Sequence, residues 1–286
     1  MIEALQFGFM QRALLAGVLV SIACGIIGTY VVINRIVFIS GGIAHAAYGG
    51  IGLGYYLRVN PVLGAIVFSI LSALGMGVVQ RRVKERADTI IGVMWAIGMA
   101  LGIVFIDLSP GYAVDLMSYL FGSILTVPPS DLIIMAALDV VIVVLVLLFY
   151  KELLAISFDE TFATIENVPV NTIYLVLLCM IALTVVMMMR VVGLIMVIAM
   201  LTVPAAISGQ FVKDMRRMMI LSSILGVLFT TTGLWLSYAL NLTSGATIIL
   251  VSGVAYMLSL VGRSVWRRRR APVAQTRFLS ENGSVD

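Results

Sequence analysis

The stretch IYLVLLCMIALTVVMMMRVVGLIMVIAMLTVPAAI, residues 173–207, carries one charged side chain, Arg190, in 35 residues. An α-helix rises about 1.5 Å per residue, so one helix of this length would be much longer than the ~30 Å hydrocarbon core of a bilayer. Arg190 and Gly193 provide the natural interruption. The stretch therefore predicts two membrane spans, 173–189 and 191–207, joined by a tight turn.

The composition of the whole chain agrees with a membrane location. Hydrophobic residues make up 62% of the 286 residues and charged residues 11%, against about 45–50% and about 25% in soluble domains. A soluble fold of this length could not hide so much apolar surface. This excludes an ordinary cytosolic enzyme, a disordered protein and a disulfide scaffold. The predicted fold class is all-α, a polytopic transmembrane helix bundle.

Seven further apolar runs are long enough to cross a bilayer, which gives nine candidate segments and a predicted bundle of about eight or nine spans. They are 13–33, 37–57, 62–79, 90–108, 132–150, 218–240 and 246–261. We expect residues 1–270 to form a single transmembrane domain. The polar residues 271–286 are expected to form a flexible tail.

The basic residues predict the orientation of these spans. With nine spans, 15 of the 18 Lys and Arg residues fall on one side, and Arg12, Arg58 and Arg190 fall on the other. Basic residues collect on the cytoplasmic side of membrane proteins. The C-terminus is therefore expected in the cytoplasm and the N-terminus outside. The net charge of +4 then reflects membrane orientation, and no nucleic-acid binding is expected.

The stretch between the fourth and fifth spans, residues 110–131, contains an apolar segment, 116–125, that is too short to cross. We expect a short re-entrant or interfacial helix on the outer face. Such a helix either gates a pathway or packs on the bundle, and the sequence leaves both open.

The loop 151–171 contains a predicted amphipathic helix of about ten residues in the cytoplasm. Ser157 and Glu160 have the spacing of a capping box, Asn167 suits a left-handed helix end, and Pro169 stops continuation. Three apolar side chains share one face of this helix: Phe158, Phe162 and Ile165. They either pack on the protein's own helix ends or insert into a groove on a partner subunit.

Two ionisable residues lie deep in predicted spans. His45, the single histidine, lies about 12 Å into the second span, and Asp139 about 10 Å into the fifth. Intramembrane ionisable groups are costly and are therefore candidates for function. His45 either contacts a metal, since neutral imidazole is a common ligand, or makes a structural hydrogen bond. Asp139 has two possible roles. It is a structural acid, hydrogen-bonded to neighbouring helices or protonated, or it belongs to a translocation pathway.

Other polar and small residues extend these candidates. Asp107, with Asp115 and Asp131, lies near the outer face and either attracts cations or marks span ends. Gly41 and Gly49 share a face of small residues with His45. This face either packs closely on another helix or lines a cavity. Pro204 is expected to kink the seventh span, as a hinge or as a static bend.

Four segments together resemble the membrane permease subunits of bacterial ABC importers for zinc and manganese. VGLIM through LTVPAA resembles the family pattern vGxxLvxaLLxxPAA, SFDETFA resembles its cytoplasmic coupling helix, DTIIG resembles its DtxiG element, and FGSIL resembles its fGxll element. In this chain they occupy residues 192–206, 157–163, 88–92 and 121–125.

The resemblance implies a homodimeric permease in a prokaryotic cytoplasmic membrane. Its partners would be a dimer of ABC ATPase subunits and an extracytoplasmic metal-binding protein. A divalent transition metal, zinc or manganese and possibly iron, would be the transported substrate, with no permanently bound cofactor. The chain itself would not be an enzyme. The coupling helix would comprise Phe158, Asp159, Glu160, Phe162, Ala163, Ile165 and Asn167.

Two positions depart from the family pattern. The family has Asp four residues before the histidine of the second span, where this chain has Gly41, so a carboxylate ligand is missing. Asn167 replaces the Gly that ends the coupling helix. An importer for a metal chelate, a siderophore or a cobalamin-like solute therefore remains an alternative. A self-contained channel or carrier would need intramembrane charge pairs, of which the sequence has few.

Overall fold

The structure of the protein, a computed structural model, describes residues 6–83, 86–109, 120, 122, 124–191, 193–194 and 197–270. Across these residues the regular secondary structure is helical, which confirms the predicted all-α bundle. The elements are α1 Gly8–Ile33, α2 Val37–Tyr56, α3 Pro61–Arg82, α4 Ala87–Asp107, η2 Ile124–Thr126, α6 Pro129–Leu148, α7 Tyr150–Phe158, α8 Glu160–Ile165, α9 Val170–Val191, α10 Val197–Phe211, α11 Met215–Leu240 and α12 Ser244–Arg270.

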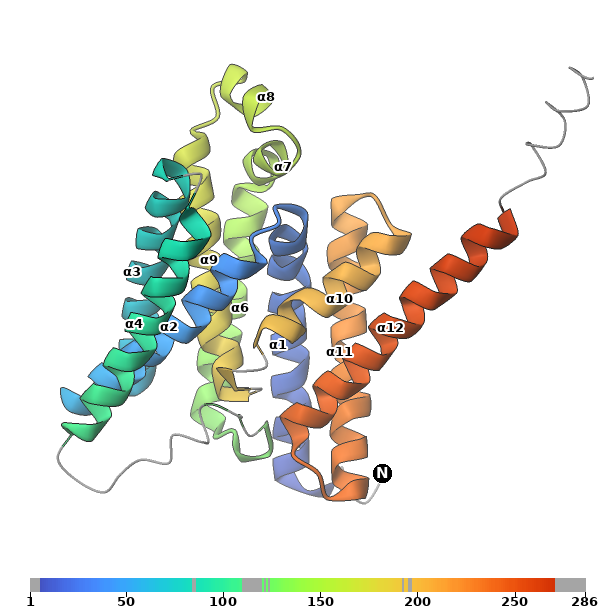
Figure 1. Cartoon of the computed structure of the whole chain (residues 1–286). Helices are drawn as coiled ribbons and strands as arrows, with labels where there is room; N and C mark the ends of the chain where they lie inside the picture. The colour runs from blue at the N-terminus through green and yellow to red at the C-terminus, as the bar shows by residue number, and fades with distance from the viewer. Residues whose placement is uncertain are drawn as a thin grey trace, which may run out of the picture.

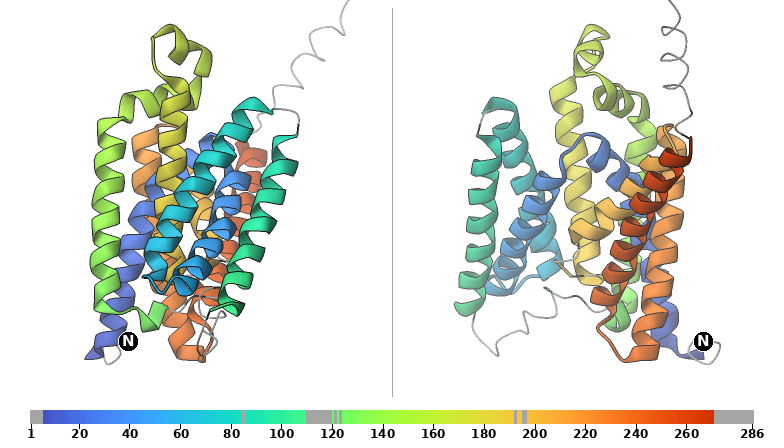
Figure 2. Two further views of the ribbon diagram at one scale, coloured as in Figure 1. Left: turned by 90° about the vertical axis from the view of Figure 1, so that its left-hand side faces the viewer. Right: turned by 45° about the vertical axis from the view of Figure 1, so that its right-hand side comes forward.

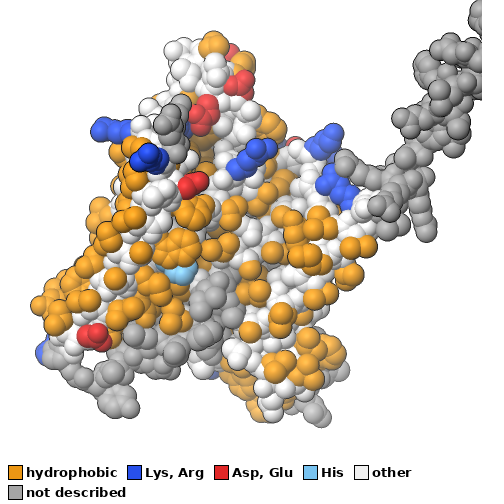
Figure 3. Space-filling view, in the orientation of Figure 1, with side chains coloured by type: hydrophobic (Ala, Val, Ile, Leu, Met, Phe, Trp, Pro, Cys, Tyr) orange, Lys and Arg blue, Asp and Glu red, His pale blue; other side chains and the backbone are white. Residues whose placement is uncertain are grey.

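Three helices form the centre of the bundle. In the most apolar windows of α1, α2 and α9, 67% to 78% of residues are buried, against 22% in α4, α6 and α12. Figures 1 and 2 show α3 and α4 beside α2 on one side, with α10, α11 and α12 on the other side of α1. The outer helices therefore present their apolar side chains outward, as lipid-facing helices do, and Figure 3 shows these side chains across the surface.

The predicted number of spans, eight or nine, agrees with the described helices. Among the residues that the structure describes, eight helices are long and apolar enough to cross a membrane, while α10 has 15 residues, which is about 22 Å of helix. Figure 1 shows α10 running from inside the bundle toward the end where α11 begins. The buried apolar side chains of α10, among them Met200 and Leu201, pack mainly against α1, α11 and α12. Composition alone could not reveal this, because packing against protein and packing against lipid select the same residues.

Although α10 is short, it brings the chain to the end of the bundle where α11 begins, as a full span would do. The described N-terminal region and the C-terminal end of α12 consequently lie at opposite ends of the bundle (Figure 1). The break that precedes α10 falls where the sequence predicts it, since α9 ends at Val191 and Gly193 adopts a positive φ of 82°. Pro204 lies buried inside α10.

Local signals set several helix ends. The Asn60 side chain accepts a hydrogen bond of 2.9 Å from the Val62 N–H, and Pro61 occupies the first helical position of α3. Asp214 caps α11 by accepting from the Arg217 N–H at 3.2 Å. Asn241, with a left-handed backbone, ends the same helix.

Glycines allow α2 to lie close to its neighbours. A Cβ atom at Gly49 would lie 2.6 Å from the Gly98 carbonyl oxygen of α4, and one at Gly41 would lie 2.8 Å from Ile198 Cδ1 of α10. Both distances are too short for any side chain larger than hydrogen without a shift. The small face that carries His45 is therefore used for close helix packing at these two positions.

Two predicted segments lie mainly or wholly outside the described residues. They are the external helix at 116–125 and the tail at 271–286. Next to the first of these, η2 forms a short 3-10 turn with Ile124 buried and packs against α1.

Candidate functional site

Helices α7 and α8 project from one end of the bundle, between α6 and α9 (Figures 1 and 2). Most of the described basic residues lie on elements that begin or end there, and we call it the basic end. These are Arg35, Arg81, Arg82, Arg86, Lys151, Lys213, Arg216, Arg217 and Arg263. Figure 3 shows most of the blue side chains gathered toward this end, whereas Arg12 and Arg58 belong to the other.

The α8 helix begins at a different cap from the predicted one. The Asp159 carboxylate accepts hydrogen bonds from the N–H groups of Thr161 and Phe162, at 2.8 and 3.1 Å. The prediction of a capping box from Ser157 to Glu160 is wrong, because α7 continues through Phe158 and keeps Ser157 inside a helix. Its hydroxyl donates to the Leu153 carbonyl at 2.7 Å instead. The predicted single helix is thus two helices joined at Asp159.

The end of α8 has the geometry that its sequence indicates. Asn167 adopts a left-handed φ of 58°, and the Val168 N–H donates to the Ala163 carbonyl oxygen at 2.9 Å. This left-handed residue closes the helix and turns the chain toward Pro169 and α9. Ala163 is fully buried and holds α8 against the rest of the molecule.

The apolar face of this segment is exposed. Phe158, Phe162 and Ile165 are 67%, 55% and 73% accessible. They therefore do not pack on the protein's own helix ends within the single chain, which was one of the two expectations. Exposed large apolar side chains, held on a fixed scaffold beyond the membrane helices, are typical of a surface that inserts into a partner.

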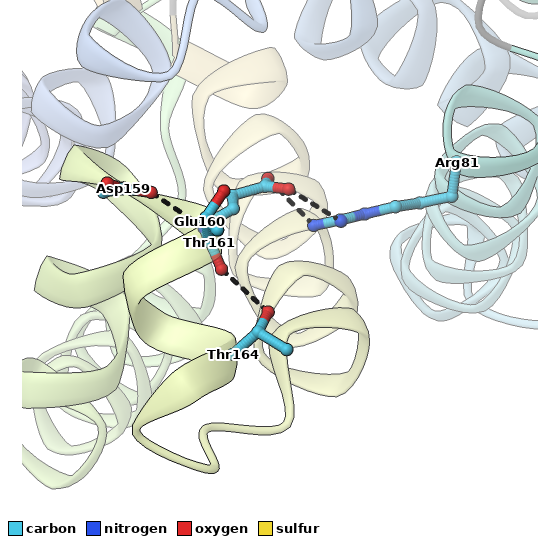
Figure 4. Close-up of polar contacts among 5 residues, drawn as sticks. All are labelled: Arg81, Asp159, Glu160, Thr161 and Thr164. Atoms are coloured by element: carbon cyan, nitrogen blue, oxygen red, sulfur yellow. Dashed lines mark hydrogen bonds and ion pairs between the residues drawn. The ribbon is translucent and has the colours of Figure 1, made fainter.

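Two contacts attach α7 and α8 to distant helices. Arg81, near the end of α3, donates to both carboxylate oxygens of Glu160, at 3.0 and 3.1 Å (Figure 4), and its guanidinium lies 4.4 Å from the centre of the Tyr174 ring. Asn34, at the end of α1, donates to the Ser157 hydroxyl at 2.9 Å. The segment is consequently attached to α3 through α8 and to the end of α1 through α7.

Sequence reasoning missed the contact between Arg81 and α8 and used Arg81 only to orient the spans. Its partner lies 79 positions along the chain, and no local spacing signals such a pair. Glu160, predicted to form a capping box with Ser157, instead makes this bidentate ion pair.

His45 lies on α2 and packs against α4. Its ring stacks on Trp95, with centroids 4.2 Å apart and an interplanar angle of 27°. The Nδ1 atom is buried and has no hydrogen-bond partner among the described residues. The pale-blue histidine is visible in Figure 3 on the face that α2 and α4 share. A nitrogen held in a fixed ring and left without a partner retains its lone pair or proton for a ligand.

The aspartates predicted with His45 lie elsewhere. Asp107 is exposed at the end of α4. Asp139 is 6% accessible in α6, and both of its carboxylate oxygens lack a hydrogen-bond partner in the described part of the chain. The Ile198 side chain occupies the space beside Gly41 into which a side chain at that position would point. The described residues contain no group of three or more His, Cys, Asp or Glu side chains placed to hold a metal ion.

Comparison with known proteins decides the family. The sequence profile of the ABC 3 transport family matches residues 6–263 of this chain. The chain belongs to the ABC 3 transport family. This confirms the resemblance to metal ABC permeases that the sequence motifs indicate, and it makes the chain a transport subunit and not an enzyme.

Relatives of this ABC 3 permease match along nearly their whole length. An uncharacterized membrane protein of Synechocystis sp. is 61% identical over 263 residues, which are 92% of this chain and 94% of that protein. The manganese transport system membrane protein MntC of Listeria monocytogenes is 33% identical over 257 residues, 90% of this chain and 91% of that protein.

A solved structure shares both the fold and the sequence of this permease. PsaBC from Streptococcus pneumoniae, in complex with Fab, superimposes with a TM-score of 0.83 and 32% identity, covering 90% of this chain and 93% of that chain. The long apolar helices of the described residues and these matches together make the ABC 3 permease a multi-pass membrane protein.

Proposed function

We propose that this chain is the permease subunit of an ATP-driven importer for a divalent transition metal, with manganese as the first candidate. The observation that supports this most strongly is the 33% identity, over 90% of the chain, to a membrane protein named for manganese transport. Zinc and iron are the further candidates, because imidazole and carboxylate ligands accept all three metals.

The energy would come from a separate ATPase subunit. The chain has no GxxxxGK[ST] nucleotide-binding motif, and its exposed apolar face on α7 and α8 fits a groove on such a partner. Phe158, Phe162 and Ile165 would enter the groove, while Ala163 and Asn167 fix the helix that carries them. ATP binding by the partner would then move α8, and Glu160 and Arg81 would pass the movement to α3.

The metal pathway would run past His45. A single imidazole is an incomplete ligand set, and the structure places neither Asp107 nor Asp139 beside it. We therefore propose that a second copy of the chain brings its own His45 to the pathway in a homodimer. An extracytoplasmic metal-binding protein would deliver the ion to the end of the bundle opposite α8.

The distribution of basic residues supports the cytoplasm as the location of the basic end. The helices α7 and α8 and the C-terminal end of α12 would then lie inside the cell, where ATP is available. The membrane would be the cytoplasmic membrane of a prokaryote, since the named relatives are bacterial.

The function is tested by measuring the metal content of cells. Total manganese, zinc and iron are measured by mass spectrometry in cells that lack the gene and in cells where it has been restored. We expect a selective fall in one metal, manganese first, that the restored gene reverses. If no free metal changes, the substrate is a chelate or another solute, and the proposed metal import is wrong.

The Arg81–Glu160 pair supplies a second test at the basic end. Arg81→Gln should lower uptake about fivefold, the equivalent of ~1 kcal/mol, while the partly exposed pair contributes little to stability. The exchanged pair, Arg81→Glu with Glu160→Arg, should recover part of the uptake. Arg82→Gln, which removes an exposed neighbouring charge, is the matched control. Equal uptake in Arg81→Gln and wild type would exclude the mechanical role.

A further inference from the structure

A deep groove opens between α6 and α11, with α1 as its floor. Its volume is about 940 Å³, and Ile22 and Ile26 of α1 lie at the bottom. The walls are apolar side chains of the two outer helices: Val143, Val146, Leu147, Met219, Ile220 and Ile224. Several of these side chains are well exposed, so the groove is open to the region that a bilayer occupies.

The groove is charged at one end. Lys151 of α7 and Arg216 of α11 belong to its lining, at the basic end, together with one carboxylate, Glu152. The Arg216 guanidinium lies 4.7 Å from the centre of the Tyr150 ring, which holds the cation over the mouth of the groove. No ion pair joins Lys151 or Arg216 to an acidic side chain in the described part of the chain.

We propose that this groove binds a phospholipid with an anionic headgroup, from the leaflet at the basic end. The acyl chains would lie along α1 between α6 and α11, and the phosphate would accept hydrogen bonds from Lys151 and Arg216. Basic pockets between membrane helices recognise anionic headgroups in this way. The proposal does not depend on which solute the permease carries.

The arrangement of the groove favours a lipid over the other possible ligands. Free phosphate would need the two cations but not the apolar walls that extend below them. An apolar protein helix could cover the walls of the groove. It would leave the excess positive charge of Lys151 and Arg216 over the single carboxylate of Glu152 without a partner. A phospholipid matches both parts of the groove. Its anionic headgroup would lie at the charged mouth, and its acyl chains would lie against the apolar walls.

The test uses the full chain purified in detergent and transferred into phosphatidylcholine discs. The discs contain a minor fraction of phosphatidylglycerol with the same acyl chains. Native mass spectrometry measures the lipids that stay bound to the protein. We expect phosphatidylglycerol to be enriched about fivefold to tenfold over its share of the disc. The double variant Lys151→Gln with Arg216→Gln should lose this enrichment.

A matched variant separates the groove from general surface charge. Arg82→Gln with Arg263→Gln also removes two exposed cations from the basic end but lies outside the groove, and it should keep the enrichment. Ile224→Trp, which fills the groove from α11, should reduce bound lipid of both headgroup types. Circular dichroism melting of each variant shows that the bundle remains folded.

Three outcomes would overturn the proposal. The first is equal enrichment in the groove variant and in wild type. The second is loss of enrichment in the Arg82→Gln and Arg263→Gln control, which would assign the effect to net charge. The third is displacement of phosphatidylglycerol by excess inorganic phosphate, which would identify a site for the free ion.

Discussion

Replacing Phe162 with aspartate should abolish metal import while leaving the helix bundle folded. Phe162 is 55% accessible at the tip of α8, so its removal creates no cavity in the protein core. Burial of such a ring in a partner groove contributes about 1.5–3 kcal/mol, and a carboxylate in the same groove carries a desolvation penalty in addition. The partner ATPase would then lose its mechanical contact, and we expect uptake to fall at least about tenfold.

The measurement compares uptake and ATP hydrolysis in membranes that contain the permease with its ATPase subunit. Thr161→Asp is the matched control, because it adds the same charge to the neighbouring exposed position of α8. It should retain most of the uptake. Normal uptake in the Phe162→Asp variant would count against the docking role of α8, provided that the thermal melting of the two variants is the same.

Replacing His45 with alanine should produce the second large loss. If the Nδ1 or Nε2 nitrogen of His45 contacts the ion in transit, the alanine variant should fail to restore the metal content of cells that lack the gene. Mutation of residues that merely orient metal ligands already costs 10–100-fold in affinity or activity. We therefore expect uptake to fall by at least about tenfold.

A phenylalanine variant distinguishes ligand binding from packing. The His45 ring stacks on Trp95, and His45→Phe keeps an aromatic ring for this contact but removes both nitrogens. Both variants should be inactive if the imidazole binds the metal. Full uptake with His45→Phe would show instead that the stacking on Trp95 is what matters, and the proposed pathway role would be wrong.

Features set by local chemistry could be predicted from the sequence. Composition and hydropathy place the chain in a membrane and give the positions of eight helices, because the bilayer requires about 20 consecutive apolar residues at each crossing. The left-handed end of α8 at Asn167 and the break near Gly193 follow from backbone preferences. The motifs for the family are likewise short and continuous.

The site depends on residues that are distant in the sequence. Asp159 and Ser157 are both good helix caps, and only the continuation of α7 decides between them. Arg81 and Glu160 meet because α3 packs against α9 and ends at the basic end, where α8 immediately precedes the start of α9. Trp95 reaches His45 because glycines let α2 and α4 lie close to each other.

The sequence by itself determined that this is a multi-pass helical membrane protein with a short amphipathic segment between two of its spans. Both properties depend on the free energy of transferring consecutive side chains between water and hydrocarbon. The tertiary structure decided that α10 stops short of a full crossing, which helices brace α8, and that α6 and α11 enclose a groove. Those features arise because helix packing brings together side chains that are far apart in the chain, and protein neighbours bury apolar groups as well as lipid does.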